Sequence, residues 1–181
     1  MARIDDFRAQ LTGGGARPSQ FRVLLTFPNW VSLGAPAAQA GQFLIKSSTL
    51  PASIITPIDV PFRGRYAKIA GERQFANWNI TVINDNDFLI KNALEIWSKG
   101  ILEHDATNGR MAPNEYTSDL FVQQLDRNDN ILKEYKMFNC FPQNIQEIQL
   151  DFGATTQLEE YQVEFSVDYW LAADQGGAGA R

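Results

Sequence analysis

Residues 75–97 read FANWNITVINDNDFLIKNALEIW, and the spacing of the apolar side chains changes halfway along this stretch. In the first half, three apolar residues alternate with Asn and Thr: Trp78, Ile80 and Val82. Strict alternation is the pattern of a strand that buries one of its two faces. The first half therefore predicts a strand whose apolar face contributes to the core.

The second half of the stretch has the spacing of a helix. Four Asn and Asp residues at 84–87 precede it, and their side-chain oxygens can accept hydrogen bonds from the free N–H groups that start a helix. Apolar residues then recur every three or four positions, with Leu94 and Trp97 among them. We expect one helix over about 87–101, with Trp78 and Trp97 packed in the core rather than placed in a catalytic site.

Strand patterns dominate the rest of the chain. They are expected at 20–27, 42–50, within 54–72, and at 119–125, 131–141, 145–152 and 158–172. Gly64 is a turn candidate, and the run DRNDN at 126–130 is a hairpin signal. Loops are expected at 28–41 and 103–118, and a short helix is expected over residues 4–11. The sequence thus predicts a mainly β fold.

Length and composition indicate one globular domain. The chain has 181 residues, of which 44% are hydrophobic and 20% charged, and it contains no internal repeat. Residues 1–19 are expected to form an N-terminal arm and residues 173–181 a flexible C-terminal tail. Neither a membrane span nor a signal peptide is expected, because no apolar run is long enough. The one cysteine, Cys140, cannot form an internal disulfide and is expected to be a small buried residue.

The last predicted strands have an apolar face and an acidic face. Five alternate residues of the final strand are apolar: Tyr161, Val163, Phe165, Val167 and Tyr169. In the preceding strand, Ile148, Leu150 and Phe152 are expected on the apolar face. The polar positions on the opposite faces are Glu147, Gln149, Asp151, Glu160, Gln162, Glu164 and Asp168.

Negative charge is concentrated in this part of the chain. Segment 143–170 contains six acidic residues and no Lys or Arg, whereas the rest of the chain has 16 basic and 15 acidic residues. One interpretation is an ordinary solvated sheet face. The other is a surface that repels polyanions, because a solvated face usually mixes both signs of charge.

Catalytic signatures are weak throughout. One histidine, His104, and one cysteine do not make a zinc site, and no serine has the surroundings of a nucleophile elbow. The run GGGARPS at 13–19 lacks the Lys-Ser/Thr ending of a phosphate-binding loop. A pI of about 4.9 disfavours a nucleic-acid-binding module. We therefore predict no enzyme activity, no metal and no cofactor, although two carboxylates of the last strands could in principle face each other across a cleft.

Several stretches carry a resemblance to a known family. They are ARPSQFRV (16–23), TLPASIITPIDVPF (49–62), IAGERQFANWNITVINDNDF (69–88), FPQNIQEIQLDF (141–152) and YQVEFSVDYW (161–170). In this order they cover most of the chain, and together they resemble the tail tube proteins of contractile-tailed, T-even-like bacteriophages. The expected loops at 28–41 and 103–118 and the Gly-rich tail depart from that pattern.

The resemblance implies two packed antiparallel sheets with the helix at the flank. It also implies hexameric rings that stack into a tube inside the contractile sheath, with strands of neighbouring subunits joined into a ring-shaped β-barrel. Implied partners are further copies of the chain, the sheath protein, the baseplate tube initiator, the tail terminator and, inside the channel, DNA and the tape-measure protein. The subunit would be made and assembled in the host cytoplasm and reside in the virion.

On this interpretation, the seven polar residues of the acidic face line the channel and let DNA slide past. The arm would contact a neighbouring subunit or ring through Arg3, Phe7, Arg8, Leu11 and Arg17, unless it is simply a disordered terminus. The structural core is expected to include Trp78, Ile80, Val82, Leu94, Trp97 and Phe165. Two alternatives stay open, namely a single-ring initiator or terminator protein and the inner-tube protein of a related contractile injection system.

Overall fold

The long strand β7 (Ile131–Ile145) belongs to two antiparallel sheets. The computed structural model describes residues 3–10, 15–103 and 108–174. Its other strands are β1 (Phe21–Leu24), β2 (Ile45–Ser48), β3 (Ser53–Phe62), β4 (Arg65–Phe75), β5 (Trp78–Ile83), β6 (Ser118–Leu125), β8 (Glu160–Ser166) and β9 (Tyr169–Asp174). Its helices are α1 (Ile4–Gln10), α2 (Gly34–Leu44), α3 (Leu89–Ile101) and α4 (Pro113–Tyr116).

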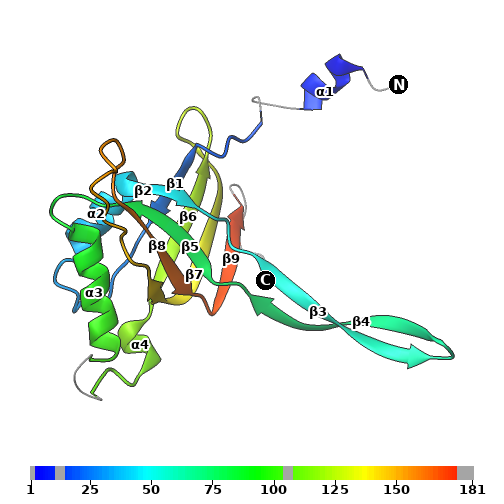
Figure 1. Ribbon diagram of the computed structural model, residues 1–181. Helices are drawn as coiled ribbons and strands as arrows, with labels where there is room; N and C mark the ends of the chain where they lie inside the picture. The colour runs from blue at the N-terminus through cyan, green and yellow to red at the C-terminus, as the bar shows by residue number, and fades with distance from the viewer. Residues whose placement is uncertain (1–2, 11–14, 104–107, 175–181) are drawn as a thin grey trace.

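The two sheets share β7 because its two halves have different neighbours. The first half pairs with β6 on one side and β9 on the other, and β6 also pairs with β1, which makes the first sheet. The second half pairs with β8, followed by β5 and β2, which makes the second sheet. Figure 1 shows the two groups of strands side by side, with α2 and α3 at one flank. The predicted mainly β fold with two antiparallel sheets is confirmed.

The core is built from the apolar faces of both sheets. Cross-strand pairs on β5 and β8 set Trp78 against Phe165 and Ile80 against Val163. The Trp78 and Phe165 rings lie 5.6 Å apart, a distance at which such pairs attract each other. All six residues expected in the core are buried: Trp78, Ile80, Val82, Leu94, Trp97 and Phe165.

Helix α3 starts two residues after its expected beginning. Phe88 has a left-handed backbone, and the helix follows it. The Oδ1 atom of Asp85 accepts a hydrogen bond from the Leu89 N–H at 3.0 Å, so one of the four Asn/Asp residues does satisfy a free N–H of the first turn. The Trp97 ring then packs at 5.5 Å from Phe27, which fixes the apolar stripe of α3 in the core.

Each of the four indole N–H groups donates a hydrogen bond to a distant backbone carbonyl. The pairs are Trp30 to Glu115, Trp78 to Thr49, Trp97 to Tyr116 and Trp170 to Ala52. Two of them attach α4 to the rest of the molecule, and two attach the chain that leads into β3. Because a buried indole N–H is costly without a partner, these bonds fix where the connecting segments lie.

Strands β3 and β4 form a two-stranded hairpin that projects from the sheets (Figure 1). Its turn consists of Arg63 and Gly64, whose φ angles are 45° and 81°. Positive φ at both central residues is the geometry of a two-residue hairpin turn, and Gly adopts it without strain. The turn predicted at Gly64 is confirmed, and the strand pieces expected within 54–72 are one continuous hairpin.

One predicted loop is wrong, and one predicted strand is shorter than expected. Residues 28–41 were expected to be a loop and 42–50 a strand, yet α2 occupies Gly34–Leu44 and β2 covers only Ile45–Ser48. The buried residues of α2 are small, namely Gly34, Ala37 and Gly41. Such a helix is stabilised by close packing and not by a row of large apolar residues, so hydrophobic periodicity does not reveal it.

The predicted pairing of 145–152 with 158–172 is present only at its start, where Ile145 pairs with Val163 and the Gln146 N–H donates to the Gln162 carbonyl. Strand β7 ends at Ile145, and none of residues 146–159 belongs to a strand. On this edge of β8, β7 pairs only with the residues from Val163 to Ser166, and the segment that follows does not continue the ladder along Glu160 and Tyr161. Ile148 still packs against the core, but Leu150 and Phe152 are exposed.

The final predicted strand is two strands. The chain turns at Val167–Asp168, and β9 joins the first sheet through β7. Tyr169 is therefore 38% exposed and does not share the buried face of Tyr161. The expected loop at 103–118 is likewise wrong in part, because it contains α4.

At the two ends of the chain, the structure agrees with the prediction only in part. Helix α1 lies where a short helix over 4–11 was expected, and Figure 1 shows it apart from the sheets. Strand β9 reaches Asp174 and so includes the first two residues of the expected tail. Leu11, His104 and residues 175–181 lie outside the described residues.

Candidate functional site

The outward face of the second sheet is polar. The register sets Asn79 of β5 against Glu164 of β8, and Thr81 against Gln162. Since the opposite face of the same strands is buried, this alternation is the direct result of the period-2 pattern in the sequence. The outward face therefore presents amides, hydroxyls and carboxylates to whatever lies beyond it.

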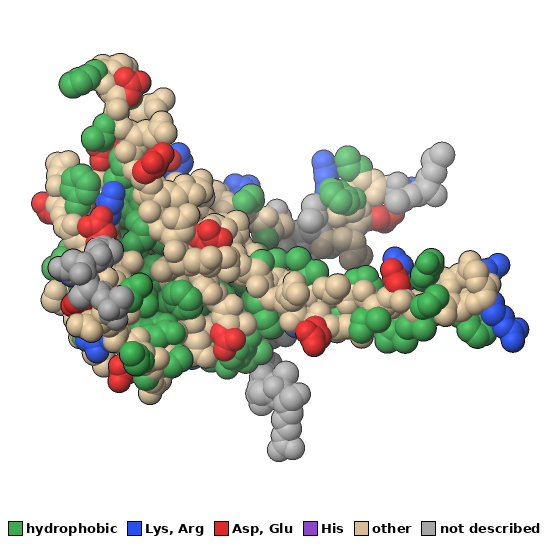
Figure 2. Space-filling model, turned by 60° about the horizontal axis from the view of Figure 1, so that its bottom comes forward, with side chains coloured by type: hydrophobic (Ala, Val, Ile, Leu, Met, Phe, Trp, Pro, Cys, Tyr) green, Lys and Arg blue, Asp and Glu red, His purple; other side chains and the backbone are tan. Residues whose placement is uncertain are grey.

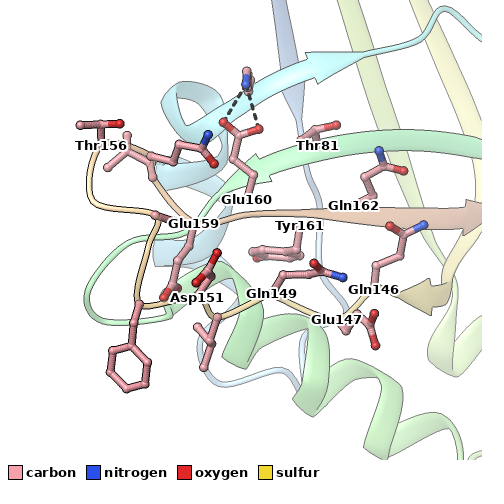
Figure 3. Close-up of a pocket in the computed structure, with 16 residues that line it drawn as sticks. Thr81, Gln146, Glu147, Gln149, Asp151, Thr156, Glu159, Glu160, Tyr161 and Gln162 are labelled. Carbon is pink, nitrogen blue, oxygen red and sulfur yellow. Dashed lines mark hydrogen bonds and ion pairs between the residues drawn. The ribbon is translucent and has the colours of Figure 1, made fainter.

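A hollow of about 1190 Å³ opens at one end of this face, between β8 and the segment 146–159. Figure 3 shows the segment running beside β8 with polar side chains on both sides of the hollow. Five of the seven residues predicted for the acidic face line it: Glu147, Gln149, Asp151, Glu160 and Gln162. The sequence thus identified most of a surface whose local strand pairing it predicted wrongly.

The other two predicted residues lie elsewhere. Glu164 is further along β8, where its Oε1 atom accepts a hydrogen bond from Asn77 Nδ2 at 2.9 Å. Asp168 lies in the turn between β8 and β9 and accepts a hydrogen bond from Asn139 Nδ2 at 3.2 Å. Glu164 remains on the outward face of the second sheet, whereas Asp168 is not part of β8 and does not line the hollow.

One basic residue that the sequence analysis did not predict, Lys46, also lines the hollow. The Nζ atom of Lys46, from β2, lies 2.7 Å and 2.8 Å from the two carboxylate oxygens of Glu160 (Figure 3). With Glu147, Asp151 and Glu159, the lining carries four carboxylates and one ammonium group, which leaves three negative charges. Lys46 is far from segment 143–170 in the sequence, and only the β2–β5–β8 pairing brings it here.

Two of the carboxylates have local structural roles. Asp151 Oδ1 accepts a hydrogen bond from the Gly153 N–H at 2.8 Å and holds the turn that follows it. Glu159 Oε2 accepts a hydrogen bond from Asn84 Nδ2 at 2.9 Å. Among the described residues, no group of three or more His, Cys, Asp or Glu side chains is placed to hold a metal ion.

Tyr161 supports the hollow from the core side. Its side chain is buried, and its hydroxyl has no hydrogen-bond partner. Burial, and then the charges of Asp85 and Glu95, raise the pKa of this phenol. The Lys91 ammonium lies 5.7 Å from the ring centre, on the side of α3. Tyr161 is therefore a neutral packing residue beneath the acidic surface.

The predicted arm residues fall into two groups. Arg3 and Arg8 belong to the region of α1, where the Arg3 N–H donates to Asp6 and the Arg8 guanidinium lies 3.9 Å from Asp5. Phe7 is exposed on the same helix. Arg17, by contrast, is attached to the first sheet, because its carbonyl accepts a hydrogen bond from Gln124 Nε2 at 2.7 Å.

The sequence of this chain matches a known protein family. The sequence model of the family described as phage tail tube protein matches residues 16–173. The chain belongs to this family. One relative is the tail tube protein gp19 of Enterobacteria phage T4. The two sequences are 31% identical over 92% of this chain and 98% of the relative. The tail tube protein of Serratia phage KSP90 is 28% identical over 89% and 92% of the two chains.

Two solved structures have the same fold as this chain. The tube-terminating cap of the anti-feeding prophage aligns with a TM-score of 0.65 and 15% identity, over 88% of this chain and 91% of that chain. The sheath–tube complex of an extracellular contractile injection system aligns with a TM-score of 0.59 and 13% identity, over 92% and 97%. No helix within the described part of this family member is long and apolar enough to cross a membrane.

Proposed function

We propose that this tail tube subunit forms hexameric rings that stack into a hollow tube inside the contractile sheath and conduct DNA on ejection. The observation that carries the proposal is the 31% identity to the T4 tail tube protein over nearly the full length of both chains. Its partners would be further copies of itself, the sheath protein, the baseplate tube initiator, the tail terminator and the tape-measure protein. It would be assembled in the host cytoplasm, and its role is structural rather than catalytic.

Ring formation is supported by the edges of the second sheet. Among the described residues, β2 pairs only with β5, and the last part of β7, residues 141–145, pairs only with β8. Two unpaired edges invite further strand pairing. If β2 of one subunit pairs with this part of β7 in the next subunit, six second sheets close into one barrel without a free edge.

The polar face of the second sheet would then line the channel. Its opposite face is occupied by the core, so only the polar face can meet water in the lumen. Gln162 and Glu164 lie in the middle of this wall, Glu160 lies near its end, and Glu147, Gln149 and Asp151 continue it along the hollow. Asp168 lies apart from them.

An acidic wall suits the passage of DNA. A basic wall would hold DNA by neutralising phosphates and releasing their counterions. Carboxylates repel the phosphates instead, and at ordinary salt this repulsion extends over about 8–10 Å. The positive charge of Lys46 is offset by Glu160, with which it forms an ion pair. Replacing Glu160 and Glu164 with Lys should slow DNA ejection, and unchanged ejection would contradict the proposed role of the wall.

The arm would contact a neighbouring subunit or ring. Its exposed Ile4 and Phe7, together with Arg3 and Arg8, form no part of the core. Arg17 would anchor the base of the arm on the first sheet. Deletion of residues 1–14 should weaken tube assembly, and a truncated chain that assembles normally would exclude this role.

A second candidate is a protein that adds only one ring, such as an initiator or terminator. The chain aligns with the anti-feeding prophage cap with a TM-score of 0.65. Because tube and cap proteins share the fold, this similarity is compatible with either role. A third is the inner tube of an injection system, to which the TM-score of 0.59 points. The sequence identity to phage tail tube proteins favours the tube subunit over both.

Electron microscopy of the purified, concentrated protein, alone and with added phage baseplates, tests this choice. A tube subunit should give long hollow filaments of stacked six-fold rings in at least one of these samples. Single rings that never stack would indicate an initiator or terminator. A chain that forms no ring in either sample would overturn the proposed function.

A further inference from the structure

The segment between α3 and α4 contains the dipeptide Asn108–Gly109. Of the twelve asparagines in the sequence, only Asn108 is followed by glycine. The segment is attached to the end of α3 by one isolated antiparallel bridge, between Leu102 and Gly109. Figure 1 shows this part of the chain at the flank of the molecule, beside α3 and α4. The dipeptide is therefore held against the body although it lies outside the strands.

The bridge leaves the nitrogen of Gly109 without a partner. The Glu103 N–H donates to the Asn108 carbonyl at 3.0 Å. The Arg110 N–H donates to the Ile101 carbonyl at 3.2 Å. In an antiparallel pair of this type, the two opposed residues exchange no hydrogen bond themselves. The Gly109 N–H accordingly has no acceptor among the residues that the structure describes.

Packing requires glycine at position 109. A Cβ atom there would lie 2.1 Å from the Ile101 carbonyl oxygen, which is too close for any side chain. The next residue is fixed as well, because the Arg110 guanidinium lies over the Trp30 ring at 4.4 Å. Glycine is also the residue that least hinders the backbone after an asparagine from closing into a ring. The fold therefore maintains, beside Asn108, the neighbour that leaves its side chain most reactive.

The side chain of Asn108 is available for reaction. It is exposed, and it forms no hydrogen bond within the described part of the chain. Its amide carbon and the Gly109 nitrogen belong to the same short piece of chain, so they can meet without a partner molecule. An exposed amide, a free neighbouring nitrogen and a glycine that packing requires thus occur together at this one position.

We propose that Asn108 is a site of spontaneous deamidation in the folded protein. The Gly109 nitrogen gives its proton to a base in solution and attacks the Cγ atom of Asn108. A bond forms between these two atoms, the bond from Cγ to the amide nitrogen breaks, and ammonia leaves after taking up a proton. Solvent water then opens the five-membered succinimide at either carbonyl and yields aspartate or isoaspartate. This inference concerns the chain itself and does not depend on tube formation.

The two products differ in their effect on the backbone. Aspartate keeps the backbone and the bridge. Isoaspartate carries the chain through the former side chain, so one methylene is added between residues 108 and 109 and the hydrogen bonds of Glu103 and Arg110 lose their common register. Because the Arg110 N–H satisfies a carbonyl at the end of α3, isoaspartate should loosen the last turn of this helix.

The added charge alone is expected to matter little. Figure 2 shows basic and acidic side chains scattered over the body of the molecule. On such a surface, one further exposed carboxylate is screened by water and salt. The altered backbone of isoaspartate is therefore the change that should affect the structure.

Mass spectrometry of the aged, full-length chain tests the proposal. The purified protein is kept at mildly alkaline pH in water enriched in heavy oxygen and is then digested with trypsin. In the tryptic peptide 100–110, GILEHDATNGR, Asn108 is the one residue with a side-chain amide. This peptide should lose its amide, gain one heavy oxygen atom and become a substrate for an isoaspartyl methyltransferase. Mildly acidic pH should slow the reaction, since the attacking nitrogen must lose its proton.

Asn114 is the matched comparison within the same chain. It is exposed too, but Glu115 follows it, and the Glu115 N–H donates to the Ala112 carbonyl at 2.9 Å. Asn108 should lose most of its amide before Asn114 loses a measurable fraction. The Asn108→Gln variant should keep its amide under the same conditions, because its longer side chain would have to close a six-membered ring.

Hydrogen exchange gives a second readout, which reports on the bridge. Exchange at the Arg110 amide should be faster in the isoaspartate form than in the unmodified chain. The Asn108→Asp variant carries the same new charge on an ordinary backbone and should exchange as slowly as the unmodified chain. Equal exchange in the isoaspartate form and in Asn108→Asp would overturn the structural consequence.

A synthetic peptide with the sequence of residues 100–110 is the positive control for the chemistry. If the peptide deamidates while the folded chain does not, or if the chain reacts only in denaturant, the proposal is overturned. Equal loss of amide at Asn108 and Asn114 would also overturn it, because the reaction would then not depend on Gly109.

Discussion

The Lys46 ammonium binds both carboxylate oxygens of Glu160, at 2.7 Å and 2.8 Å. The two residues come from β2 and β8, which lie on either side of β5. The pair makes the polar face locally neutral at one point and joins the edge strand to the middle of the second sheet. The acidic surface therefore includes one basic residue and is not uniformly negative.

Replacing Lys46 with Met should change stability little. The two side chains are 54% and 34% exposed, and ion pairs of this kind contribute below about 1 kcal/mol. Thermal unfolding of the variant should occur within about 4 °C of the unmodified chain. Glu160→Gln, which removes the other partner, should behave alike. A loss of about 3 kcal/mol or more would mean that the pair is buried in the subunit.

Trp170→Phe should loosen the base of the hairpin. The substitution keeps an aromatic ring but removes the N–H that donates to the Ala52 carbonyl, at a cost of about 1 kcal/mol. Hydrogen exchange at the Ala76 amide, which shares that carbonyl, should become faster. Tyr169→Phe is the control, because it alters an exposed neighbour without changing this bond. Equal exchange in Trp170→Phe and the unmodified chain would contradict the role of the indole.

Gly100→Ala should destabilise the contact between α3 and Trp30, which lies in the segment between β1 and α2. A Cβ atom at this position would lie 2.2 Å from the Trp30 ring. The ring cannot easily move, because its N–H is bound to the Glu115 carbonyl and the Arg110 guanidinium lies over it at 4.4 Å. We expect a loss of about 1–3 kcal/mol in chemical denaturation.

The control for this prediction is the neighbouring position. Lys99→Ala changes an exposed side chain of the same helix and should leave stability within about 0.5 kcal/mol. If Gly100→Ala is as stable as Lys99→Ala, the Trp30 ring is free to yield.

Cys140 should be inert in the folded chain. Burial raises the pKa of its thiol from 9.0 to about 12, so little thiolate is present at pH 8. A thiol reagent should react only after unfolding. Because the unfolded chain releases this proton first as the pH rises, stability should fall above about pH 9 and continue to fall towards pH 12. Cys140→Ala should show a shallower decline in the same range, and identical declines would contradict the assignment.

Local patterns predicted the parts of the fold that depend on local contacts. The β5–α3 unit follows from alternation at Trp78 and helical spacing at Trp97, since both residues face the core. The turn at Gly64 follows from the backbone that the turn requires. Helix α2 was missed because its buried residues are small, and residues 146–152 were misread because alternation of apolar and polar residues does not show whether a segment stays paired with its neighbouring strand.

The site was predictable in composition but not in arrangement. Segment 143–170 revealed an acidic surface, and five of its seven polar candidates line the hollow. Lys46 comes from a distant strand, so no local pattern could place it beside Glu160.

Electron cryo-microscopy of assembled tubes, at a resolution that places side chains, tests the central claim most directly. The account predicts that the second sheet forms the inner wall, with Gln162 and Glu164 facing the channel and β2 paired with residues 141–145 of the next subunit. A tube in which Gln162 and Glu164 face the sheath, or lie buried between subunits, would contradict it.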